Sequence, residues 1–325
     1  MGMASAFYDS CVLFAAIDVG VFAKLAETGE SDAAALASAL ALDERGTRLL
    51  LDACVALELL FKRNERYRNT PESAAFLVPG SPADLSGAMR YNRDVYPAWG
   101  RLKEMVRTGR PVEKPEAHLG QDRERTRTFV LAMHHRALAI GRAVVPLVDL
   151  AGASRVLDVG GGPGTYSVLL ARANPQLACT VLDLPEVAGI ATELIREQGM
   201  AARVGALSGD YRHASFPAGN DAVMFFGCLH QESPDSIRGL IRTAHARLRP
   251  GGKVFVMDMM TDATHTQPRF SALFAVNMAL TAESGWVFSD AELGGWLAET
   301  GFEDVTVRPL PPPMPHWLAS AKKNA

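Results

Sequence analysis

One strand-to-helix turn constrains this chain of 325 residues more than any other segment, and it reads D-V-G-G-G-P-G from Asp158 to Gly164. The apolar residues 156–159 predict a strand that ends in this turn, and residues 165–173 predict a helix after it. Glycines in such a turn let the backbone bend sharply and approach a ligand closely. The start of a helix also offers free N–H groups. The turn therefore predicts a ligand-binding loop at the end of a strand.

The spacing of the glycines separates two kinds of nucleotide site. A nicotinamide dinucleotide site would carry G-x-G-x-x-G, but counting from Gly160 or Gly162 places Thr165 or Ser167 at the last glycine position. The observed pattern is D-x-G-x-G-x-G, with Asp158 two residues before the first glycine. A carboxylate at that point would repel a pyrophosphate and attract an amino group. A nicotinamide dehydrogenase is therefore only a distant second interpretation.

Two further carboxylates follow the next strands of the predicted sheet. Asp183 ends the strand of residues 179–182, where a carboxylate can accept hydrogen bonds from both hydroxyls of a ribose. Asp210, in the run Gly209-Asp210-Tyr211, follows a third strand, beside the place expected for an adenine. Three aspartates at the ends of successive strands, together with the glycine loop, indicate one common site. That site would bind a nucleoside that carries an amino acid.

Strands and helices alternate from residue 155 onward, which predicts an α/β fold with a mostly parallel sheet. Pro185 and the pair Ser233-Pro234 predict helix starts, and Pro250 to Gly252 predict the end of the later of these helices. The run from Ser289 to Glu292 predicts a capping box at the start of a late helix. The predicted strands are residues 156–159, 179–182, 221–226, 254–257, 302–307 and 316–321.

The first 90 residues are rich in Ala and Leu at helical spacing and predict several short helices. We expect one amphipathic helix from Ala6 to Ala26 and a second that starts after Ser31-Asp32, where either residue would cap it. A third, mostly buried helix should follow Asp43-Glu44 and include Leu49. Residues 60–68 predict a β-hairpin. Short helices followed by a hairpin make a winged helix.

Charge argues against the DNA binding that a winged helix often performs. Residues 1–90 hold 8 Lys and Arg against 12 Asp and Glu, a net charge of −4, and the whole chain carries −3. An acidic domain repels phosphate and is a poor reader of DNA. We therefore expect neither nucleic acid nor an anionic membrane as a partner, and we favour a protein–protein role such as dimerisation for this region.

The cellular compartment is predicted from the apolar runs, the first residues and the cysteines of the chain. No apolar run approaches the ~20 residues that a membrane span needs, and the start M-G-M-A-S lacks the basic region and cleavage site of a secretion signal. Cys11, Cys54, Cys179 and Cys228 lie far apart without C-x-x-C spacing. They are typical of reduced cysteines in a cytoplasmic protein, and they do not predict a structural zinc site.

Several runs of the chain together resemble one known family. The chain contains V-L-D-V-G-G-G-P-G-T-Y-S, V-L-D-L-P-E-V, G-D-Y and L-R-P-G-G-K-V-F-V-M-D. These runs resemble class I S-adenosylmethionine-dependent methyltransferases, and more narrowly the small-molecule O-methyltransferases of caffeic acid, acetylserotonin and hydroxyneurosporene type. The run L-L-D-A-C-V-A-L-E-L-L-F-K-R-N-E-R-Y-R-N-T-P-E fits the N-terminal winged-helix dimerisation domain of that family.

This resemblance implies an architecture and a biological setting. It implies a Rossmann-like methyltransferase sheet, mostly parallel with the last strand antiparallel, in a cytoplasmic homodimer of secondary metabolism. It divides the chain into a winged-helix dimerisation domain (1–90), a helical linker that contributes to the substrate pocket (91–140) and a methyltransferase domain that binds S-adenosylmethionine (141–325).

The resemblance also implies a cofactor site without a metal, with S-adenosyl-L-methionine as cofactor and S-adenosyl-L-homocysteine as product. The glycine loop would be shaped for the cofactor, Asp183 would hold its ribose, and Asp210 and Tyr211 would flank its adenine. Phe226 stands where the family commonly has a lysine near the adenine. The cofactor-binding residues implied in this way are Asp158, Gly160, Gly161, Gly162, Gly164, Asp183, Leu184, Gly209, Asp210, Tyr211 and Phe226.

His230 stands where the family places its general base. A phenol or alcohol is a weak nucleophile until its proton leaves, and a neutral imidazole can accept that proton near neutral pH. Asp258 falls on the first of two acidic positions that orient this histidine in plant members, whereas the second falls near Trp286-Val287 and is lost. The usual Asp-Trp after the histidine is replaced by Gln231-Glu232.

These departures leave alternatives beside O-methyl transfer to a small molecule. An N-, S- or C-methyltransferase would not need the base in every case, and some relatives could use the cofactor for decarboxylation or hydroxylation. Outside enzymes, the winged helix could belong to a ligand-sensing DNA-binding regulator. We favour O-methyl transfer, with His230 as the catalytic base and Asp258 as the residue that orients it.

The acceptor pocket is predicted from two helical segments that the family places beside the substrate, residues 129–139 and 270–281. Their apolar and aromatic side chains favour a flat, aromatic acceptor. The sequence assigns no role to His118 or His316. The predicted pocket residues are Met133, His134, Phe274, Asn277 and Met278.

Overall fold

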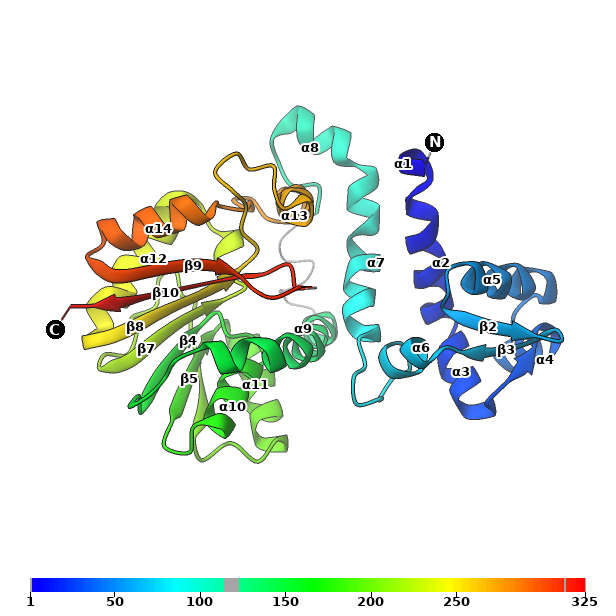
Figure 1. Cartoon of the computed structure of the whole chain (residues 1–325), viewed down its shortest axis with the longest axis horizontal. Helices are drawn as coiled ribbons and strands as arrows, with labels where there is room; N and C mark the ends of the chain where they lie inside the picture. Colours follow the sequence, from blue (N-terminus) through cyan, green and yellow to red (C-terminus); the bar gives the residue numbers. More distant parts are fainter. Residues whose placement is uncertain (1, 114–122, 313, 325) are drawn as a thin grey trace. The chain divides into compact units, whose positions relative to one another are not determined.

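The chain forms two units, Met1–Asp94 and Val95–Ala325, in a computed structural model that describes residues 2–113, 123–312 and 314–324 (Figure 1). The unit boundary falls within helix α7 (Ser86–Gly100). His118 and part of the predicted linker 91–140 lie outside the described residues. The predicted three-part division of the chain stays a prediction, and each unit is described by itself below.

Unit 1 combines short helices with a small antiparallel sheet of strand order β1-β3-β2. The predicted cap is confirmed at Asp32, whose Oδ1 accepts from the Ala35 amide at 2.8 Å. The third helix starts after Asp43 as predicted, and Asp43 Oδ1 caps it by accepting from the Gly46 amide at 2.7 Å. The predicted hairpin is also confirmed. The elements are α1 (Gly2–Ser5), α2 (Phe7–Asp18), α3 (Val21–Thr28), β1 (Ser31–Asp32), α4 (Ala33–Leu40), α5 (Glu44–Ala56), β2 (Leu60–Arg63), β3 (Arg66–Asn69) and α6 (Pro71–Phe76).

Two details predicted for unit 1 are wrong. The expected helix from Ala6 to Ala26 is two helices, because Gly20 has a φ of 81° and breaks the chain between α2 and α3. Leu49 is 55% exposed rather than buried. Helix α5 buries Thr47, Leu51 and Cys54, which follow one another at helical spacing, so Leu49 lies on the opposite face.

The core of unit 1 joins helices α2, α3 and α5 to the hairpin. Ile17, Phe22 and Leu25 are buried together with Leu51 and Tyr67. Within the described residues, no single helix is long and apolar enough to cross a membrane, although α1 through α2 and the bent continuation α3 meet the requirement of length and composition as a pair.

Unit 2 contains a seven-stranded sheet of order β6-β5-β4-β7-β8-β10-β9. Neighbouring strands from β6 to β8 are parallel, and β10 is antiparallel to both of its neighbours. The predicted α/β sheet with an antiparallel last strand is therefore confirmed. The strands are β4 (Arg155–Val159), β5 (Ala178–Asp183), β6 (Val204–Ser208), β7 (Asn220–Phe226), β8 (Leu248–Asp258), β9 (Phe302–Pro309) and β10 (Trp317–Lys323).

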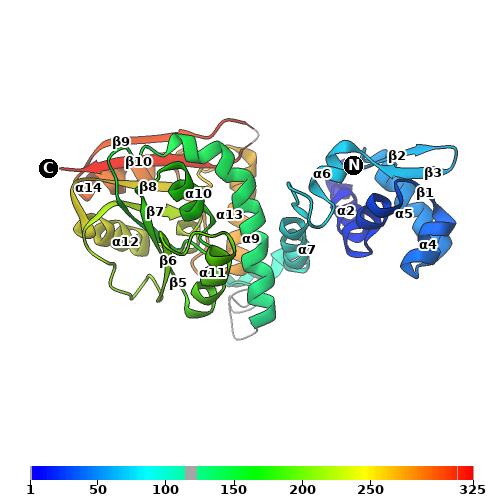
Figure 2. The same ribbon diagram turned by 90° about the horizontal axis from the view of Figure 1, so that it is seen from below.

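Helices cover both faces of this sheet, and alternate strand residues enter the two cores (Figures 1 and 2). Val156 of β4 faces the core covered by α9, α10 and α11, whereas Leu157 faces the core covered by α12 and α14. The short helix η3 follows β7. The helices of unit 2 are α8 (Leu102–Thr108), α9 (Arg123–Val144), η2 (Val145–Leu147), α10 (Thr165–Ala173), α11 (Pro185–Glu197), η3 (Leu229–Gln231), α12 (Pro234–Arg247), α13 (Arg269–Thr281) and α14 (Asp290–Glu299).

Helix boundaries in unit 2 follow the predicted signals with one exception. Pro185 and Pro234 stand in the first turns of α11 and α12, and Ser289 and Glu292 form the predicted capping box of α14. Pro250 to Gly252 do not end α12, because that helix stops at Arg247 and these residues already belong to β8. Strand pairing from Leu248 onward overrides the local turn signal.

Candidate active site

The glycine loop between β4 and α10 is held by the backbone and by one neighbouring carboxylate. The Gly160 amide donates to the carbonyl of Leu182 at 2.8 Å, so the loop is tied to the end of β5. Asp183 Oδ2 accepts from the Gly162 amide at 2.7 Å, and its Oδ1 accepts from the Leu184 amide at 2.8 Å. The predicted ribose carboxylate therefore also fixes the loop.

Asp158 lies beneath this loop and is fully buried. Its Oδ2 accepts from the Ser167 hydroxyl at 2.7 Å, while its Oδ1 has no hydrogen-bond partner in the described part of the chain. Burial raises the pKa of Asp158 to about 7. The hydrogen bond from Ser167 lowers this pKa, and the charge of Asp183 raises it. A buried acceptor without a partner is costly, and an ammonium group of a ligand would satisfy it.

Gly161 and Gly162 are glycines for different structural reasons. A Cβ on Gly161 would lie 2.6 Å from Cγ of Asp158, so only glycine lets the backbone pass this close to the carboxylate. Gly162 has a φ of 54° and would meet no atom within 4 Å. The loop backbone therefore lies directly against the Asp158 carboxylate at Gly161 and leaves open space at Gly162.

Asp183 is buried at the end of β5. Burial raises the pKa of Asp183 to about 6, the two amide hydrogen bonds oppose this shift, and the charge of Asp210 adds to it. Each of its oxygens accepts one amide and keeps a second lone pair. The carboxylate can therefore still accept hydrogen bonds from two ribose hydroxyls.

Tyr211 connects the predicted adenine side to the loop that carries His230. A Cβ on Gly160 would lie 3.3 Å from the Tyr211 ring, so this ring packs against the glycine loop. The Tyr211 hydroxyl donates to Glu232 Oε1 at 2.9 Å, and Arg212 Nε donates to the same oxygen at 2.7 Å. The Ser236 hydroxyl donates to Oε2 at 2.6 Å.

Sequence reasoning missed this role of Glu232, which is buried and forms the centre of the network. A glutamate directly before a helix start is an ordinary capping signal, and only the three donors show its use. The remaining adenine-side residues are less connected. Asp210 Oδ1 accepts from the Arg212 amide at 3.0 Å, and the buried Phe226 ring stands edge-on to Tyr166 at 5.3 Å.

His230 and Asp258 form a short-bonded, buried polar pair in the site. His230 Nδ1 lies 2.6 Å from Asp258 Oδ1, and Asp258 is 1% exposed while the His230 side chain is 13% exposed. The backbone amides of His230 and Met259 also donate to Asp258, at 3.2 Å and 2.8 Å. A carboxylate in this position holds the Nδ1–H tautomer and leaves Nε2 to accept a proton.

Two aromatic residues from other parts of the chain hold the segment that carries His230. Phe274 of α13 stands edge-on to the His230 ring at 5.1 Å between ring centroids. The Trp286 amide donates to the His230 carbonyl at 3.0 Å, and Trp286 Nε1 donates to the Glu232 carbonyl at 2.8 Å. At the position of the lost second acid, the chain thus has a tryptophan that clamps the backbone instead.

The predicted pocket residues contact the site to different degrees. His134 Nδ1 lies 2.7 Å from the Thr165 hydroxyl at the start of α10, and burial lowers the pKa of His134 to about 4. Asn277 Oδ1 accepts from Trp99 Nε1 at 2.9 Å. Met278 is buried and Met133 is half-buried, so their place in a pocket stays a prediction.

His316, to which the sequence assigned no role, is buried directly before β10. Its Nε2 lies 3.4 Å from Nη2 of Arg136 on α9. No motif marks either residue, and they are 180 positions apart in the chain. One sequence signal pointed to His316: it stands at the first position of a predicted strand, residues 316–321, in the sheet that carries the site.

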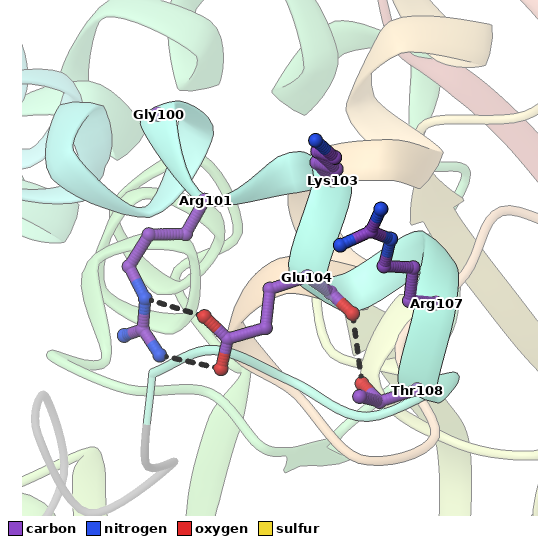
Figure 3. A pocket seen from close by; sticks show the side chains of 6 residues that line it. All are labelled: Gly100, Arg101, Lys103, Glu104, Arg107 and Thr108. Carbon is purple, nitrogen blue, oxygen red and sulfur yellow. Dashed lines mark hydrogen bonds and ion pairs between the residues drawn. The ribbon is translucent and has the colours of Figure 1, made fainter.

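A surface hollow on α8 does not belong to this site (Figure 3). Arg101 in its wall is already engaged, because its Nε and Nη2 bond both oxygens of Glu104 at 3.0 Å and 2.8 Å. None of the predicted site residues lines it. Across residues 2–113, 123–312 and 314–324, no group of three or more His, Cys, Asp and Glu side chains could hold a metal ion.

Two family models match the chain. The O-methyltransferase domain matches residues 99–303, and the O-methyltransferase dimerisation domain matches residues 1–79. Together they span most of both units, and the dimerisation domain supports the predicted homodimer.

Individual relatives match over almost the whole chain. The 3-hydroxy-5-methyl-1-naphthoate 3-O-methyltransferase of Streptomyces sahachiroi is 34% identical over 94% of this chain and 90% of its own length. An N,N-dimethyltransferase of Streptomyces rimosus is 30% identical over 99% of this chain and 95% of its own length.

A solved structure agrees with these relatives. Human N-acetylserotonin methyltransferase in complex with S-adenosylmethionine has a TM-score of 0.90 at 27% identity and covers 100% of this chain and 96% of that one. The resemblance predicted from the glycine loop and the later motifs is thereby confirmed. The chain belongs to the S-adenosylmethionine-dependent O-methyltransferase family whose members act on small molecules and carry an N-terminal dimerisation domain.

Proposed function

We propose that this S-adenosylmethionine-dependent enzyme methylates a hydroxyl group of a small aromatic acceptor, with His230 as general base and Asp258 as its positioning residue. The observation that carries the proposal is the buried pair itself, with 2.6 Å between His230 Nδ1 and Asp258 Oδ1. The carboxylate accepts from Nδ1, so Nε2 is the nitrogen that takes the acceptor's proton.

The residues of the glycine loop fit the cofactor in this proposal. When bound, S-adenosylmethionine supplies an electrophilic methyl group on a sulfonium. Asp158 Oδ1, which has no partner among the described residues, would receive the ammonium group of the cofactor, and Asp183 would accept hydrogen bonds from its ribose hydroxyls. Asp210 and Tyr211 would flank the adenine with Phe226 near it, and the backbone at Gly162 leaves open space for the ligand. Residues that hold the cofactor in this way would position its methyl group for transfer, and such positioning supplies much of the rate acceleration.

The protein controls one proton in the reaction. As the acceptor oxygen took the methyl group and the carbon–sulfur bond of the sulfonium broke to leave S-adenosylhomocysteine, the hydroxyl proton would pass to His230 Nε2. The Asp258 carboxylate would stabilise the resulting imidazolium. Besides the His230 imidazole, the Asp258 carboxylate accepts hydrogen bonds from the backbone amides of His230 and Met259, so it cannot rotate away. Phe274 keeps the imidazole ring from turning because it stands edge-on against it.

An aromatic acceptor is supported by the side chains near the base. Phe274 contacts the His230 ring, and it shares α13 with Met278 and with Asn277, whose oxygen is bonded by Trp99. Aromatic and thioether groups pack well against a flat ring. The naphthoate O-methyltransferase among the relatives acts on an acceptor of this kind, by its name.

His230→Gln tests the proposal. We expect kcat to fall ~10²–10⁴-fold, the usual contribution of a general base, while the Kd of S-adenosylhomocysteine stays within about twofold. Turnover is followed by mass spectrometry as the gain of one CH₂ by a hydroxyaryl acceptor. The matched control is His245→Gln, because His245 lies in the last turn of α12 and contacts Phe302. Unchanged kcat in His230→Gln would refute the role of the base.

N-methyl transfer is the second candidate, and it is supported by one relative, the N,N-dimethyltransferase. An amine acceptor that is already unprotonated does not need His230 as a base. An amine that is methylated as fast by His230→Gln as by the unmodified protein would favour this candidate over a hydroxyl.

We also propose that the homodimer forms through the first 90 residues. Helix α2 leaves Phe7 and Tyr8 exposed, at 48% and 60% of their surfaces, and apolar side chains in such positions are typical of an interface. Light scattering should give about 70 kDa for a dimer of the 34.9 kDa chain, whereas a single chain mass at micromolar concentration would contradict this proposal.

For the compartment, we propose the cytoplasm. All four cysteines are free, and Cys54, Cys179 and Cys228 are buried, as is usual where thiols stay reduced. Cell fractionation checks this proposal, and recovery of the protein outside the cytoplasm would contradict it.

A further inference from the structure

Arg136 on α9 is a cation with no counter-ion among residues 2–113, 123–312 and 314–324. Its side chain is half-buried, and no carboxylate of the described residues lies within ion-pairing distance of it; its partner is the neutral ring of His316, with 3.4 Å from Nη2 to Nε2. Arg212 and Arg127 of the same unit are paired with carboxylates, Glu232 and Glu193, and Arg203 donates to several backbone carbonyls, whereas Arg136 contacts only the His316 ring in the described part of the chain. A guanidinium removed from water without an anion is costly, so a ligand anion would relieve this cost.

His316 strengthens the same conclusion. A guanidinium can only donate hydrogen bonds, so Nε2 of His316 must accept and the ring proton of the neutral form lies on Nδ1. Burial and the charge of Arg136 lower the pKa of His316 to about 3, which keeps the ring neutral. Nδ1 is buried and has no partner among the described residues. The two side chains together therefore present N–H donors and a positive charge, without an acceptor group.

The Arg136–His316 pair lies at the end of the sheet that also carries the catalytic pair. Trp317, the residue after His316, pairs with Asp258 in the β10–β8 register. The charges of Asp258 and His230 both act on His316, and the charge of Arg136 also acts on Tyr166 of α10. An acceptor whose hydroxyl meets His230 thus has a donor-rich, positively charged group next to it.

We propose that Arg136 and His316 bind an anionic group of the acceptor, and that the acceptor is therefore a hydroxyaryl carboxylic acid. A guanidinium binds a carboxylate with two parallel N–H donors, which fixes orientation as well as affinity. The carboxylate would orient the ring so that one hydroxyl faces Nε2 of His230. This inference rests on the proposed function, because it concerns the acceptor of the same site.

Binding to the protein saturated with S-adenosylhomocysteine tests the inference without requiring turnover. The probes are 3-hydroxy-1-naphthoate and 3-hydroxybenzoate, each compared with its own methyl ester by calorimetry. We expect at least one acid to bind ~10-fold more tightly than its ester. In Arg136→Gln this preference should disappear, with a ~10-fold or greater loss for the acid and less than a twofold change for the ester. Arg136→Lys, which keeps the charge, should retain part of the preference.

Controls separate this inference from its competitors. Arg142→Gln changes an exposed arginine of the same helix and should leave every affinity unchanged. If Arg136→Gln weakens the binding of S-adenosylhomocysteine itself, the arginine binds the carboxylate of the cofactor, and the inference is overturned. Equal affinity for acid and ester in both ring sizes also overturns it. Failure of the proposed function would appear differently, as tight binding of an acid that no enzyme variant, including the unmodified one, can methylate.

Discussion

The cofactor side and the acceptor side of the site are built in different ways. Residues 158–164, 183–184 and 209–211 follow consecutive strands, and the backbone itself makes most of their contacts, as at Gly160, Gly162 and Leu184. The acceptor side instead joins distant segments by single side-chain contacts, such as Trp99 with Asn277 and Arg136 with His316.

This difference teaches where the chain tolerates change. A backbone contact at the end of a buried strand cannot be altered without moving the strand, because interiors are packed as closely as crystals. A contact between two side chains on separate helices is lost or replaced one residue at a time. We therefore expect mutations on the cofactor side to abolish binding, and mutations on the acceptor side to shift selectivity.

Gly161→Ala should have the largest effect on the cofactor side. The new Cβ would lie 2.6–2.9 Å from the Asp158 carboxyl carbon and both its oxygens, and Asp158 is fully buried and bonded to Ser167, so neither group can move away. We expect the affinity for S-adenosylhomocysteine to fall ~100-fold or more, or about 3 kcal/mol. Calorimetry measures this loss.

The matched control for that change is Gly189→Ala. Gly189 lies in α11, is exposed, and would meet no atom within 4 Å of a new Cβ. Alanine in a helix interior is favoured over glycine by roughly 0.5–1 kcal/mol, so the control should bind normally and unfold at a slightly higher temperature. Normal binding by Gly161→Ala would break the comparison, because the loop would then tolerate a side chain.

Asp158→Asn should have an intermediate effect that depends on pH. The folded pKa of Asp158, about 7, lies above the ordinary carboxyl value of 3.8, so ionisation opposes folding and the unliganded protein loses stability as pH rises between those values. The neutral variant avoids this loss. We expect its melting temperature without ligand to exceed that of the unmodified protein by about 2–5 °C at pH 8, with the difference vanishing near pH 4.

The affinity of the same variant should change in the opposite direction. An ammonium group needs the ionised form of Asp158, so the unmodified protein should bind S-adenosylhomocysteine up to ~10-fold less tightly for each pH unit below about 7. In Asp158→Asn we expect ~10-fold weaker binding at pH 8 and no such pH dependence. Calorimetry in two buffers of different ionisation enthalpy also counts the proton released, and a release that persists in the variant would assign it to another group.

The same comparison explains how much the sequence could predict. The cofactor side was predictable because a short-range pattern is sufficient there: a strand, a glycine run and an acid define the turn, and the order of parallel strands brings their ends to one edge. The sheet and the capped helix starts at Asp32, Asp43 and Ser289 followed from equally local signals.

The acceptor side was predictable only through the family resemblance. His230 and Asp258 were expected as a pair, and the structure brings them to 2.6 Å. Arg136 and His316 were not, because 180 residues separate them and neither belongs to a motif. Their pairing depends on how α9 and the segment before β10 pack, which is a tertiary property. For the same reason, Glu232 was interpreted as a departure rather than as the acceptor for Tyr211.

Trp99→Phe should have the smallest effect, because it removes one hydrogen bond on the acceptor side and keeps an aromatic ring. Asn277 Oδ1, which accepts from Trp99 Nε1 at 2.9 Å, would lose its partner in a residue that is only 9% exposed. One neutral hydrogen bond contributes about 1 kcal/mol, so the KM of the acceptor should rise about fivefold without a change in the Kd of S-adenosylhomocysteine.

A double-mutant cycle decides whether that effect belongs to the pair. If the hydrogen bond is the cause, Trp99→Phe should have little further effect in the background of Asn277→Ala, since the interaction is already absent there. Additive effects would mean that the tryptophan acts through the shape of its ring. A loss of cofactor affinity as large as the rise in KM would be the more serious result, because the two sides could then not be changed independently and the contrast between backbone-built and side-chain-built halves would fail.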